Sequence, residues 1–248
     1  MSYSDHFTDN KKAQLYDTRE YAAGTYSSLL WDIEKGQVDA ALARYARQPF
    51  DYLDFACGTG RVLAHVAPQA RESYGIDISP AMVERAREFV PAARIEVRNI
   101  IDDAAIERTY DVITAFRFLL NAETELRIAG LKALATRLRD GSSILLVNNH
   151  GNLASHKVVM AVPEWFRYRG KRRQSGNRLS HRAVIRAATE AGLTIRRVSG
   201  CGLLGGRLAQ SLPQRLARRM EYWGSRSLLS HFASNQLYVA RIQSERTS

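Results

Sequence analysis

The residues best suited to chemistry lie where a short apolar run ends in a tight turn. The stretch Asp51–Arg61 has the sequence Asp-Tyr-Leu-Asp-Phe-Ala-Cys-Gly-Thr-Gly-Arg, and an apolar segment compatible with a helix follows it. Gly58 and Gly60 let the backbone approach a ligand closely, because no Cβ stands in the way. The start of the following helix offers free backbone N–H groups to polar or anionic groups. This strand–turn–helix pattern predicts a nucleotide-like ligand.

A missing glycine and two carboxylates narrow the choice of ligand. A dinucleotide fingerprint needs G-x-G-x-x-G, whereas Leu63 stands at the third glycine position, which weakens a nicotinamide hypothesis without removing it. Asp54 precedes the turn. Asp77 ends the next apolar run, where a carboxylate can accept two hydrogen bonds from a ribose diol. A sheet turn without a ligand would explain the glycines, but nothing in the adjacent sequence requires Asp77.

Strand and helix signals alternate from residue 52 onward. Apolar runs predict strands at 52–57, 73–78, 94–100, 110–116, 143–147, 193–198 and 236–242. Amphipathic or capped segments predict helices at 61–67, 80–90, 123–138 and 180–191. Short strand–helix–strand links favour a parallel sheet with helices on both faces. The expected fold class is α/β, with a seven-stranded, mostly parallel, doubly wound sheet.

With this motif order, the chain resembles the class I S-adenosylmethionine-dependent methyltransferases over about residues 50–148, and more loosely to 242. The resemblance implies a Rossmann-like fold and S-adenosyl-L-methionine as cofactor. In that family the strand-one acid and the turn backbone face the methionine part, the strand-two acid holds the ribose, and the end of strand three borders the adenine. The resemblance therefore implies these cofactor-binding residues: Asp54, Ala56, Gly58, Gly60, Asp77, Ile78, Asn99, Ile100 and Phe116. Ala56 stands where many members have glycine, but alanine is also small.

The methyl acceptor is expected over the carboxyl ends of strands four and five. His150 follows strand five and is the histidine best placed to act as catalytic base on a hydroxyl, although it could instead bond its own loop. Arg117 could bind an acidic acceptor, or pair with Asp102 or Asp111. The candidate acceptor-binding residues are Tyr21, Arg117, Asn121, Asn148, Asn149 and Asn152.

Three segments lie around this core. Residues 1–48 look helical beyond residue 11, with Gly24 and Gly36 dividing them, and are expected to form an N-terminal lid or cap, with core packing as the alternative. Residues 49–248 form the expected methyltransferase domain. Within it, 151–178 and 203–230 are predicted basic insertions on the acceptor side.

Net charge separates the chain into two unlike halves. Residues 1–150 carry 18 Lys and Arg against 21 Asp and Glu, while residues 151–248 carry 18 against four Glu and no Asp. Sixteen of the latter 18 are arginine, which grips phosphate through two hydrogen bonds. The basic half indicates an anionic substrate, nucleic acid or an anionic membrane, although a solvated surface could have the same composition.

One helix signal in the basic half leaves its role open. Residues 211–223 have the pattern of a capped helix with Leu216, Met220 and Trp223 on one face. A basic amphipathic helix with tryptophan can lie on an anionic membrane, so residues 203–223 could bring the protein to the inner face of the membrane. Alternatively, the apolar face of this helix can pack on the domain. The cluster 167–173 interleaves aromatic and basic residues, which would suit a phosphate-rich acceptor or RNA.

Several features of the sequence limit the function. The sequence contains no run of about 18 apolar residues, so we expect no membrane-spanning helix. The first ten residues are polar and lack the apolar core of a secretory signal. Cys57 lies in the glycine turn, which makes a structural disulfide with Cys201 unexpected and favours a cytoplasmic location. The sequence lacks the Asn/Asp-Pro-Pro-Tyr/Phe that similar enzymes use on nucleic-acid bases, and 151–248 offer no aspartate for a metal cluster like that of catechol O-methyltransferases.

The favoured function is therefore metal-independent O-methylation of a hydroxyl on a saccharide, glycolipid or related metabolite. The acceptor is expected to be a small molecule or glycan, anionic or lipid-linked. Two alternatives stay open. One is an RNA methyltransferase that uses the basic half, and the other is a non-catalytic module that binds the cofactor.

Overall fold

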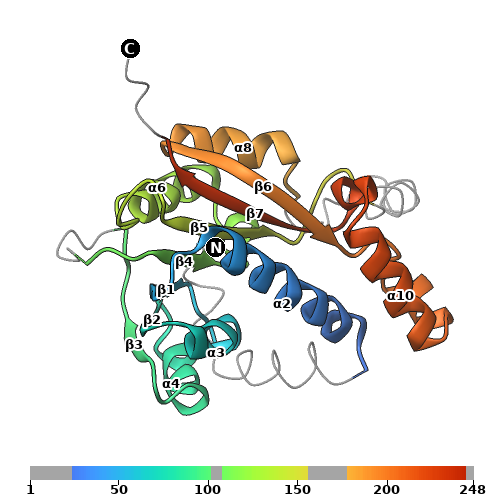
Figure 1. Ribbon diagram of the computed structural model, residues 1–248, viewed down its shortest axis with the longest axis horizontal. Helices are drawn as coiled ribbons and strands as arrows, with labels where there is room; N and C mark the ends of the chain where they lie inside the picture. The colour runs from blue at the N-terminus through green and yellow to red at the C-terminus, as the bar shows by residue number, and fades with distance from the viewer. Residues whose placement is uncertain (1–23, 102–107, 156–177, 244–248) are drawn as a thin grey trace, which may run out of the picture.

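The computed structural model describes residues 24–101, 108–155 and 178–243, and within them the strands form one sheet (Figure 1). The strands are β1 (Asp51–Phe55), β2 (Glu72–Asp77), β3 (Arg94–Val97), β4 (Val112–Ala115), β5 (Ile144–Asn149), β6 (Leu193–Cys201) and β7 (Asn235–Ile242). Their order across the sheet is β3-β2-β1-β4-β5-β7-β6. The β1 to β5 pairings are parallel, and β7 runs antiparallel to both β5 and β6. The predicted seven-stranded, mostly parallel α/β sheet is confirmed.

Helices cover both faces of this sheet. They are α2 (Tyr26–Tyr45), α3 (Arg61–Val66), η3 (Ala67–Gln69), α4 (Pro80–Phe89), α5 (Phe118–Asn121), α6 (Thr124–Ala135), α8 (His181–Glu190), α9 (Gly206–Ser211), α10 (Gln214–Ser225) and η4 (Leu228–Phe232). None of the described helices is long and apolar enough to cross a membrane.

The sheet has an apolar core on each side because its central strands are apolar at successive positions. In β5, Leu145 packs into the core that α6 and α8 cover, while Leu146 packs into the core that α2, α3 and α4 cover. Figure 1 shows these two helical layers on either side of the strands. Continuous apolar runs are typical of parallel strands buried on both faces.

Local signals fix where several helices begin. The Ser79 hydroxyl caps α4 by accepting a hydrogen bond from the Met82 backbone N–H, and Pro80 occupies the first helical position as predicted. The Ser180 hydroxyl caps α8 in the same way, by accepting from the Ala183 backbone N–H.

Two predicted boundaries are wrong. Gly36 does not divide a helix, because α2 runs through it for 20 residues. The helix predicted over 211–223 is present as α10, but it begins three residues later, because Leu212 is extended (φ −99°, ψ 152°) and Pro213 is the N-cap, while Ser211 ends the separate helix α9. A residue before proline disfavours the helical region, which explains the break.

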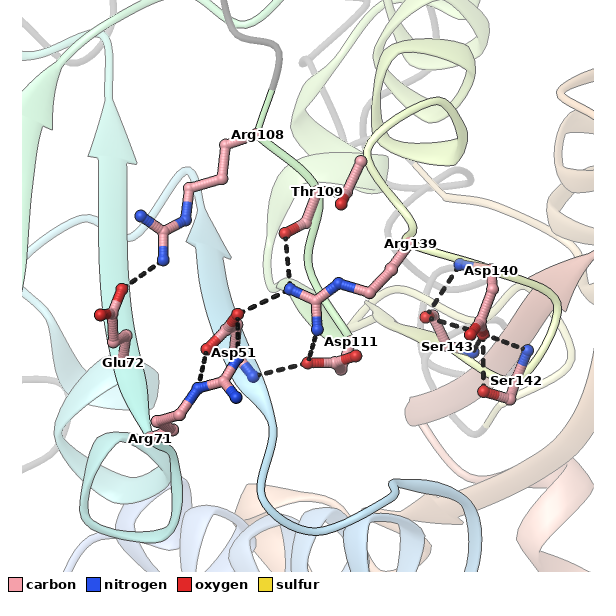
Figure 2. Close-up of polar contacts among 10 residues, drawn as sticks. All are labelled: Asp51, Arg71, Glu72, Arg108, Thr109, Asp111, Arg139, Asp140, Ser142 and Ser143. Atoms are coloured by element: carbon pink, nitrogen blue, oxygen red, sulfur yellow. Dashed lines mark hydrogen bonds and ion pairs between the residues drawn. The ribbon is translucent and has the colours of Figure 1, made fainter.

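The amino ends of the central strands are tied together by an ionic network (Figure 2). The buried Asp51 carboxylate, at the start of β1, accepts two hydrogen bonds from Arg71 at 2.9 and 2.6 Å and one from Arg139 at 2.6 Å. Arg139 also binds Asp111, whose carboxylate accepts from the Asp51 backbone N–H at 2.7 Å. This network stabilises one edge of the sheet and leaves the opposite edge, formed by the carboxyl ends of the strands, to carry a site.

Candidate functional site

The carboxyl ends of β1, β2 and β4 surround two adjoining cavities. The first is lined by Asp54, Ala56, Cys57, Gly58, Thr59, Arg61, Val62, Asp77, Ile78, Met82, Phe116, Arg117 and Asn121. The second shares Ala56, Asp77 and Ile78 with the first and adds Phe55, Ile76, Arg98, Asn99, Ile101, Phe118 and Leu126. Ligands of open α/β sheets bind at this edge, where neighbouring connections leave on opposite faces.

The glycine turn gives the first cavity its open wall. Ala56, Gly58 and Gly60 have positive φ values of 54°, 56° and 87°. A Cβ on Gly58 would meet nothing within 4 Å, so this residue leaves room for a ligand. Gly60 has a packing role, since a Cβ there would lie 3.3 Å from Ala86 Cβ and 3.3 Å from a Val90 methyl group.

Asp54 presents a buried carboxylate beside this turn. Asp54 is 1% exposed. Its Oδ1 accepts a hydrogen bond from Thr114 Oγ1 at 2.6 Å. Its Oδ2 is buried without a well-formed hydrogen bond to any described residue. Burial raises the pKa of Asp54 to about 7, although the Thr114 hydroxyl, the Leu63 backbone N–H and the charge of Arg61 favour the ionised form. A cationic group in the cavity would complete the environment of this carboxylate.

Asp77 supports the turn as well as facing the cavity. Its Oδ2 accepts from the Gly58 backbone N–H at 2.9 Å, and its Oδ1 accepts from the Ser79 backbone N–H at 2.9 Å. The expectation that nothing nearby requires Asp77 is therefore wrong. The Ile78 backbone N–H is a third donor, and because a carboxylate has about four acceptor sites, Asp77 can still accept from a hydroxyl. Burial raises the pKa of Asp77, and its backbone donors oppose that change.

Arg61 is a site residue that the sequence analysis did not single out. It begins α3, lines the first cavity, and its guanidinium carbon lies 4.1 Å from the ring centroid of Trp31 in α2. Arg61 and Asp54 thus bring opposite charges to one cavity. A signal was available, because Arg61 directly follows the Gly-Thr-Gly turn.

The second cavity has a different lining from the one expected. Asn99 lines it, but Ile100 is 1% exposed and packs in the core, while Ile101 faces the cavity. The reason is that β3 ends at Val97, three residues before the predicted end. Phe118 and Leu126 add apolar surface from α5 and α6.

On the predicted acceptor side, Arg117 and Asn121 line the first cavity, together with Phe116, which was predicted to bind the cofactor. Arg117 has a positive φ of 59°, and its backbone N–H donates to Asn148 Oδ1 at 2.6 Å. Asn148 therefore fixes the turn after β4. Asp111 pairs with Arg139 at the opposite edge of the sheet rather than with Arg117.

Asn149 and Asn152 have buried structural contacts rather than cavity positions. Both are 0% exposed. The Asn149 amide donates to the Leu179 carbonyl at 3.0 Å, and the Asn152 amide donates to the carbonyls of His231 and Ala233 at 3.0 and 2.9 Å. These bonds join the end of β5 to the segments before α8 and β7.

The remaining candidates lie elsewhere. His150 follows β5, is half-buried, and is not among the described residues that line the first cavity. Tyr21, Asp102 and most of the predicted insertion 151–178 lie outside the described residues. Of the predicted 1–48 cap, α2 packs on the core through Val38 and Leu42. Among the described residues, no three His, Cys, Asp or Glu side chains group as metal ligands would.

Comparisons with known proteins identify a methyltransferase domain in this chain. The model of a methyltransferase domain matches residues 31–198. A dTDP-4-amino-2,3,4,6-tetradeoxy-D-glucose N,N-dimethyltransferase of Saccharopolyspora spinosa is 28% identical over 154 residues, which are 62% of this chain and 55% of that protein. A ribosomal protein L11 methyltransferase of Cupriavidus metallidurans is 34% identical over 96 residues, 38% of this chain and 30% of that protein. These matches thus span between about a third and a little over half of the relatives' lengths.

Solved structures share the fold. An S-adenosylmethionine-dependent methyltransferase from Clostridium acetobutylicum superposes with a TM-score of 0.63 at 15% identity, covering 94% of this chain and 98% of that one. A magnesium protoporphyrin IX methyltransferase from Synechocystis PCC 6803, solved with bound SAH, gives 0.61 at 15% identity, covering 96% of both chains. The family model matches most of this chain, and the order of the strands and the glycine turn agree with that match. This chain therefore belongs to the class I, Rossmann-like S-adenosylmethionine-dependent methyltransferases.

Proposed function

We propose that this enzyme transfers a methyl group from S-adenosylmethionine to a hydroxyl of a saccharide, glycolipid or related small metabolite, without a metal. The choice of acceptor rests mainly on Arg117, which lines the first cavity and whose backbone is held by a hydrogen bond to Asn148. Its positive charge favours an acceptor with an anionic group. Asn121 lines the same cavity and supplies neutral hydrogen-bonding atoms, which suit sugar hydroxyls.

The cavity residues fit the cofactor. The buried Asp54 Oδ2 lacks a well-formed hydrogen bond, and it would accept from the ammonium of the methionine part. Arg61 would bind the carboxylate of that part. Beside the open face of Gly58, Asp77 would accept hydrogen bonds from the ribose hydroxyls. Asn99 and Ile101 would border the adenine in the second cavity.

The chemistry follows from positioning. When bound, the cofactor would supply a methyl group on a sulfonium for in-line displacement, in which the carbon–sulfur bond breaks as the bond to the acceptor oxygen forms. Asn121 would hold the acceptor against this methyl group, Phe116 would border the cofactor, and Arg117 would anchor the anionic part of the acceptor. In the base role, His150 would take the hydroxyl proton on an imidazole nitrogen. This role requires the acceptor to reach from the first cavity to the end of β5.

Two relatives bear on the choice of acceptor. The Saccharopolyspora spinosa relative is named for methylating a dTDP-linked sugar, and an Anoxybacillus flavithermus relative, 26% identical over 150 residues covering 58% of this chain and 56% of that protein, is a malonyl-[acyl-carrier protein] O-methyltransferase. The first name includes a diphosphate-linked sugar methylated on nitrogen, and the second a malonyl group methylated on oxygen; both groups are anionic, which supports an anion-linked acceptor here. Both cysteines are free and buried, which supports a reducing, cytoplasmic location.

The acceptor can be found by incubating host extracts with the enzyme and S-adenosylmethionine carrying a carbon-13 methyl group. We expect mass spectrometry to detect a labelled methyl ether on a small molecule, and the Asp77→Ala variant to leave the extract unlabelled. Label on nitrogen, or on RNA or protein alone, would contradict the proposed acceptor class. The RNA alternative further requires RNA binding that weakens steeply with added salt, because phosphate contacts release counterions.

A further inference from the structure

The surface formed by α9, α10 and η4, residues 206–232, concentrates exposed apolar side chains. We call it the α9–η4 surface. Trp223 is 70% exposed and Leu228 is 86% exposed. Of the twelve large apolar side chains exposed among the described residues, eight lie on this surface: Leu208, Leu216, Met220, Tyr222, Trp223, Leu228, Leu229 and Phe232. Contiguous apolar patches of this kind mark binding surfaces on folded proteins.

Helix α10 turns its small side chains toward the domain and its large apolar side chains toward the solvent. Its buried residues are Ala217, Glu221 and Gly224, whereas the larger Met220 and Trp223 face outward. The small inner residues let the helix approach closely, since a Cβ on Gly224 would overlap the Leu203 side chain. A soluble helix normally turns its largest apolar side chains inward. The sequence left packing on the domain open for this apolar face, and the structure shows the face exposed.

The charge of the α9–η4 surface has one sign. Its only acidic residue is Glu221, which is 0% exposed. The Glu221 carboxylate accepts from the backbone N–H groups of Leu203 and Leu204 at 3.0 and 2.8 Å, and from the hydroxyl of Tyr26 in α2. That carboxylate therefore anchors α10 and adds nothing to the outer surface. The exposed charged residues are all arginine: Arg207, Arg215, Arg218, Arg219 and Arg226.

We propose that the α9–η4 surface docks on the face of an anionic lipid bilayer. The tryptophan, leucine and methionine side chains would enter the boundary between headgroups and acyl chains, and the arginines would bind the headgroup phosphates. This inference goes beyond the methyl-transfer function and does not depend on it. It commits to a surface contact, consistent with the absence of a membrane-crossing helix among the described residues.

Other occupants fit this surface less well. RNA would use the arginines and the aromatic rings, but five of the eight exposed apolar side chains are leucine or methionine, on which bases do not stack. A two-fold dimer would bring the same patch of each subunit together, and so would set five arginines against five. An anionic bilayer matches both the apolar and the cationic part.

The α9–η4 surface lies at the same end of the strands as the two cavities. The segment 206–232 connects the end of β6 to the start of β7, and Gln236 at that start pairs with Asn149 at the carboxyl end of β5 (Figure 1). The α9–η4 surface therefore lies on the same edge of the sheet as the cofactor cavities. A docked enzyme would present that edge toward the lipid phase.

The test is co-sedimentation of the full chain with vesicles of 30% phosphatidylglycerol in phosphatidylcholine, compared with pure phosphatidylcholine. We expect binding to the anionic vesicles, and at least tenfold weaker binding for both Met220→Ser/Trp223→Ser and Arg218→Gln/Arg219→Gln. Each cation near an anionic membrane changes affinity about fivefold, so two together account for such a loss.

Matched controls come from exposed residues elsewhere. Phe89→Ser, on α4, and Arg182→Gln/Arg186→Gln, on α8, should bind vesicles as the unmodified protein does. Unchanged circular dichroism and melting temperature in every variant would exclude unfolding as the cause. The proposal is overturned if the unmodified chain ignores anionic vesicles, or if the α10 variants bind like the controls. It is also overturned if Met220→Ser/Trp223→Ser instead dissociates a dimer seen by sedimentation velocity, or abolishes tight RNA binding.

Discussion

At the scale of single residues, the ionisation of Asp54 controls the charge of the first cavity. Burial raises the pKa of Asp54 to about 7, so the carboxylate is only about one-tenth ionised at pH 6. A folded pKa above the unfolded value means that this group stabilises the free protein at low pH, and that the contribution is lost as pH rises through about 7. A bound ammonium group would favour the ionised form and oppose that loss.

This gives a pH dependence for cofactor binding. The affinity for S-adenosylmethionine should fall about tenfold between pH 8 and pH 6, because the ionised Asp54 is the form that binds an ammonium group. Equilibrium dialysis with labelled cofactor measures it. The Asp54→Asn variant should bind weakly with little change over the same range. An unmodified protein whose affinity is flat with pH would contradict the assigned partner of Asp54.

Sequence spacing indicates the cavity residues whose partners are close in the chain. Asp54, Gly58 and Asp77 lie within one strand–turn–helix–strand unit, and the structure places them around one cavity. Asn149 and Asn152 looked like acceptor ligands, but their amide partners are 30 to 81 residues away. Such long-range hydrogen bonds leave no local signal, and only the fold reveals that these amides are already engaged.

At the scale of elements, α2 shows how packing overrides a local helix breaker. Gly36 is exposed in the middle of α2, and a Cβ there would meet nothing within 4 Å. The buried side chains of Ile33, Val38 and Leu42 stabilise the helix on both sides of it. Glycine in a helix costs about 1 kcal/mol relative to alanine, which is small beside this burial.

Gly36→Ala should therefore stabilise the protein by about 0.5–1 kcal/mol, seen as a higher melting temperature. Gly192→Ala is the matched control. A Cβ on Gly192 also meets nothing within 4 Å, but its φ is +74°, so alanine should destabilise there by about 1 kcal/mol. Equal changes in melting temperature for the two substitutions would show that backbone conformation does not decide whether alanine stabilises or destabilises the protein.

At the scale of the whole molecule, the sheet separates stability from function. One edge carries the Asp51 network and the other carries the cofactor cavities. Apolar residues in the sequence predicted the seven strands, most plainly β1, β4 and β5, which are buried at every position. Such a local pattern could not predict the ionic network, whose members Asp51 and Arg139 are 88 residues apart.

Removing this network should weaken the fold without touching the cavities. Hydrogen bonds from Arg71, and then those from Arg139, lower the pKa of Asp51, so its stabilising contribution is present above the unfolded pKa near 4 and is lost as pH falls through the folded value. Asp51→Asn should cost about 1–2 kcal/mol at pH 7, a figure kept small because both arginines are partly exposed. Urea unfolding of both proteins over a series of pH values from 7 downward checks it. A difference between the variant and the unmodified protein that does not shrink as pH falls below the unfolded pKa would contradict the ionic origin.

The cofactor and the acceptor would share the first cavity, and calorimetric titration with S-adenosylhomocysteine checks this division. The unmodified chain should bind one molecule. Arg61→Met should weaken binding at least tenfold, because it removes the partner of the methionine carboxylate. Arg117→Met, a matched loss of charge from the same cavity wall, should leave the affinity unchanged while methyl transfer falls. Absence of binding heat with the folded, unmodified chain, or an equal loss of affinity in both variants, would contradict the account.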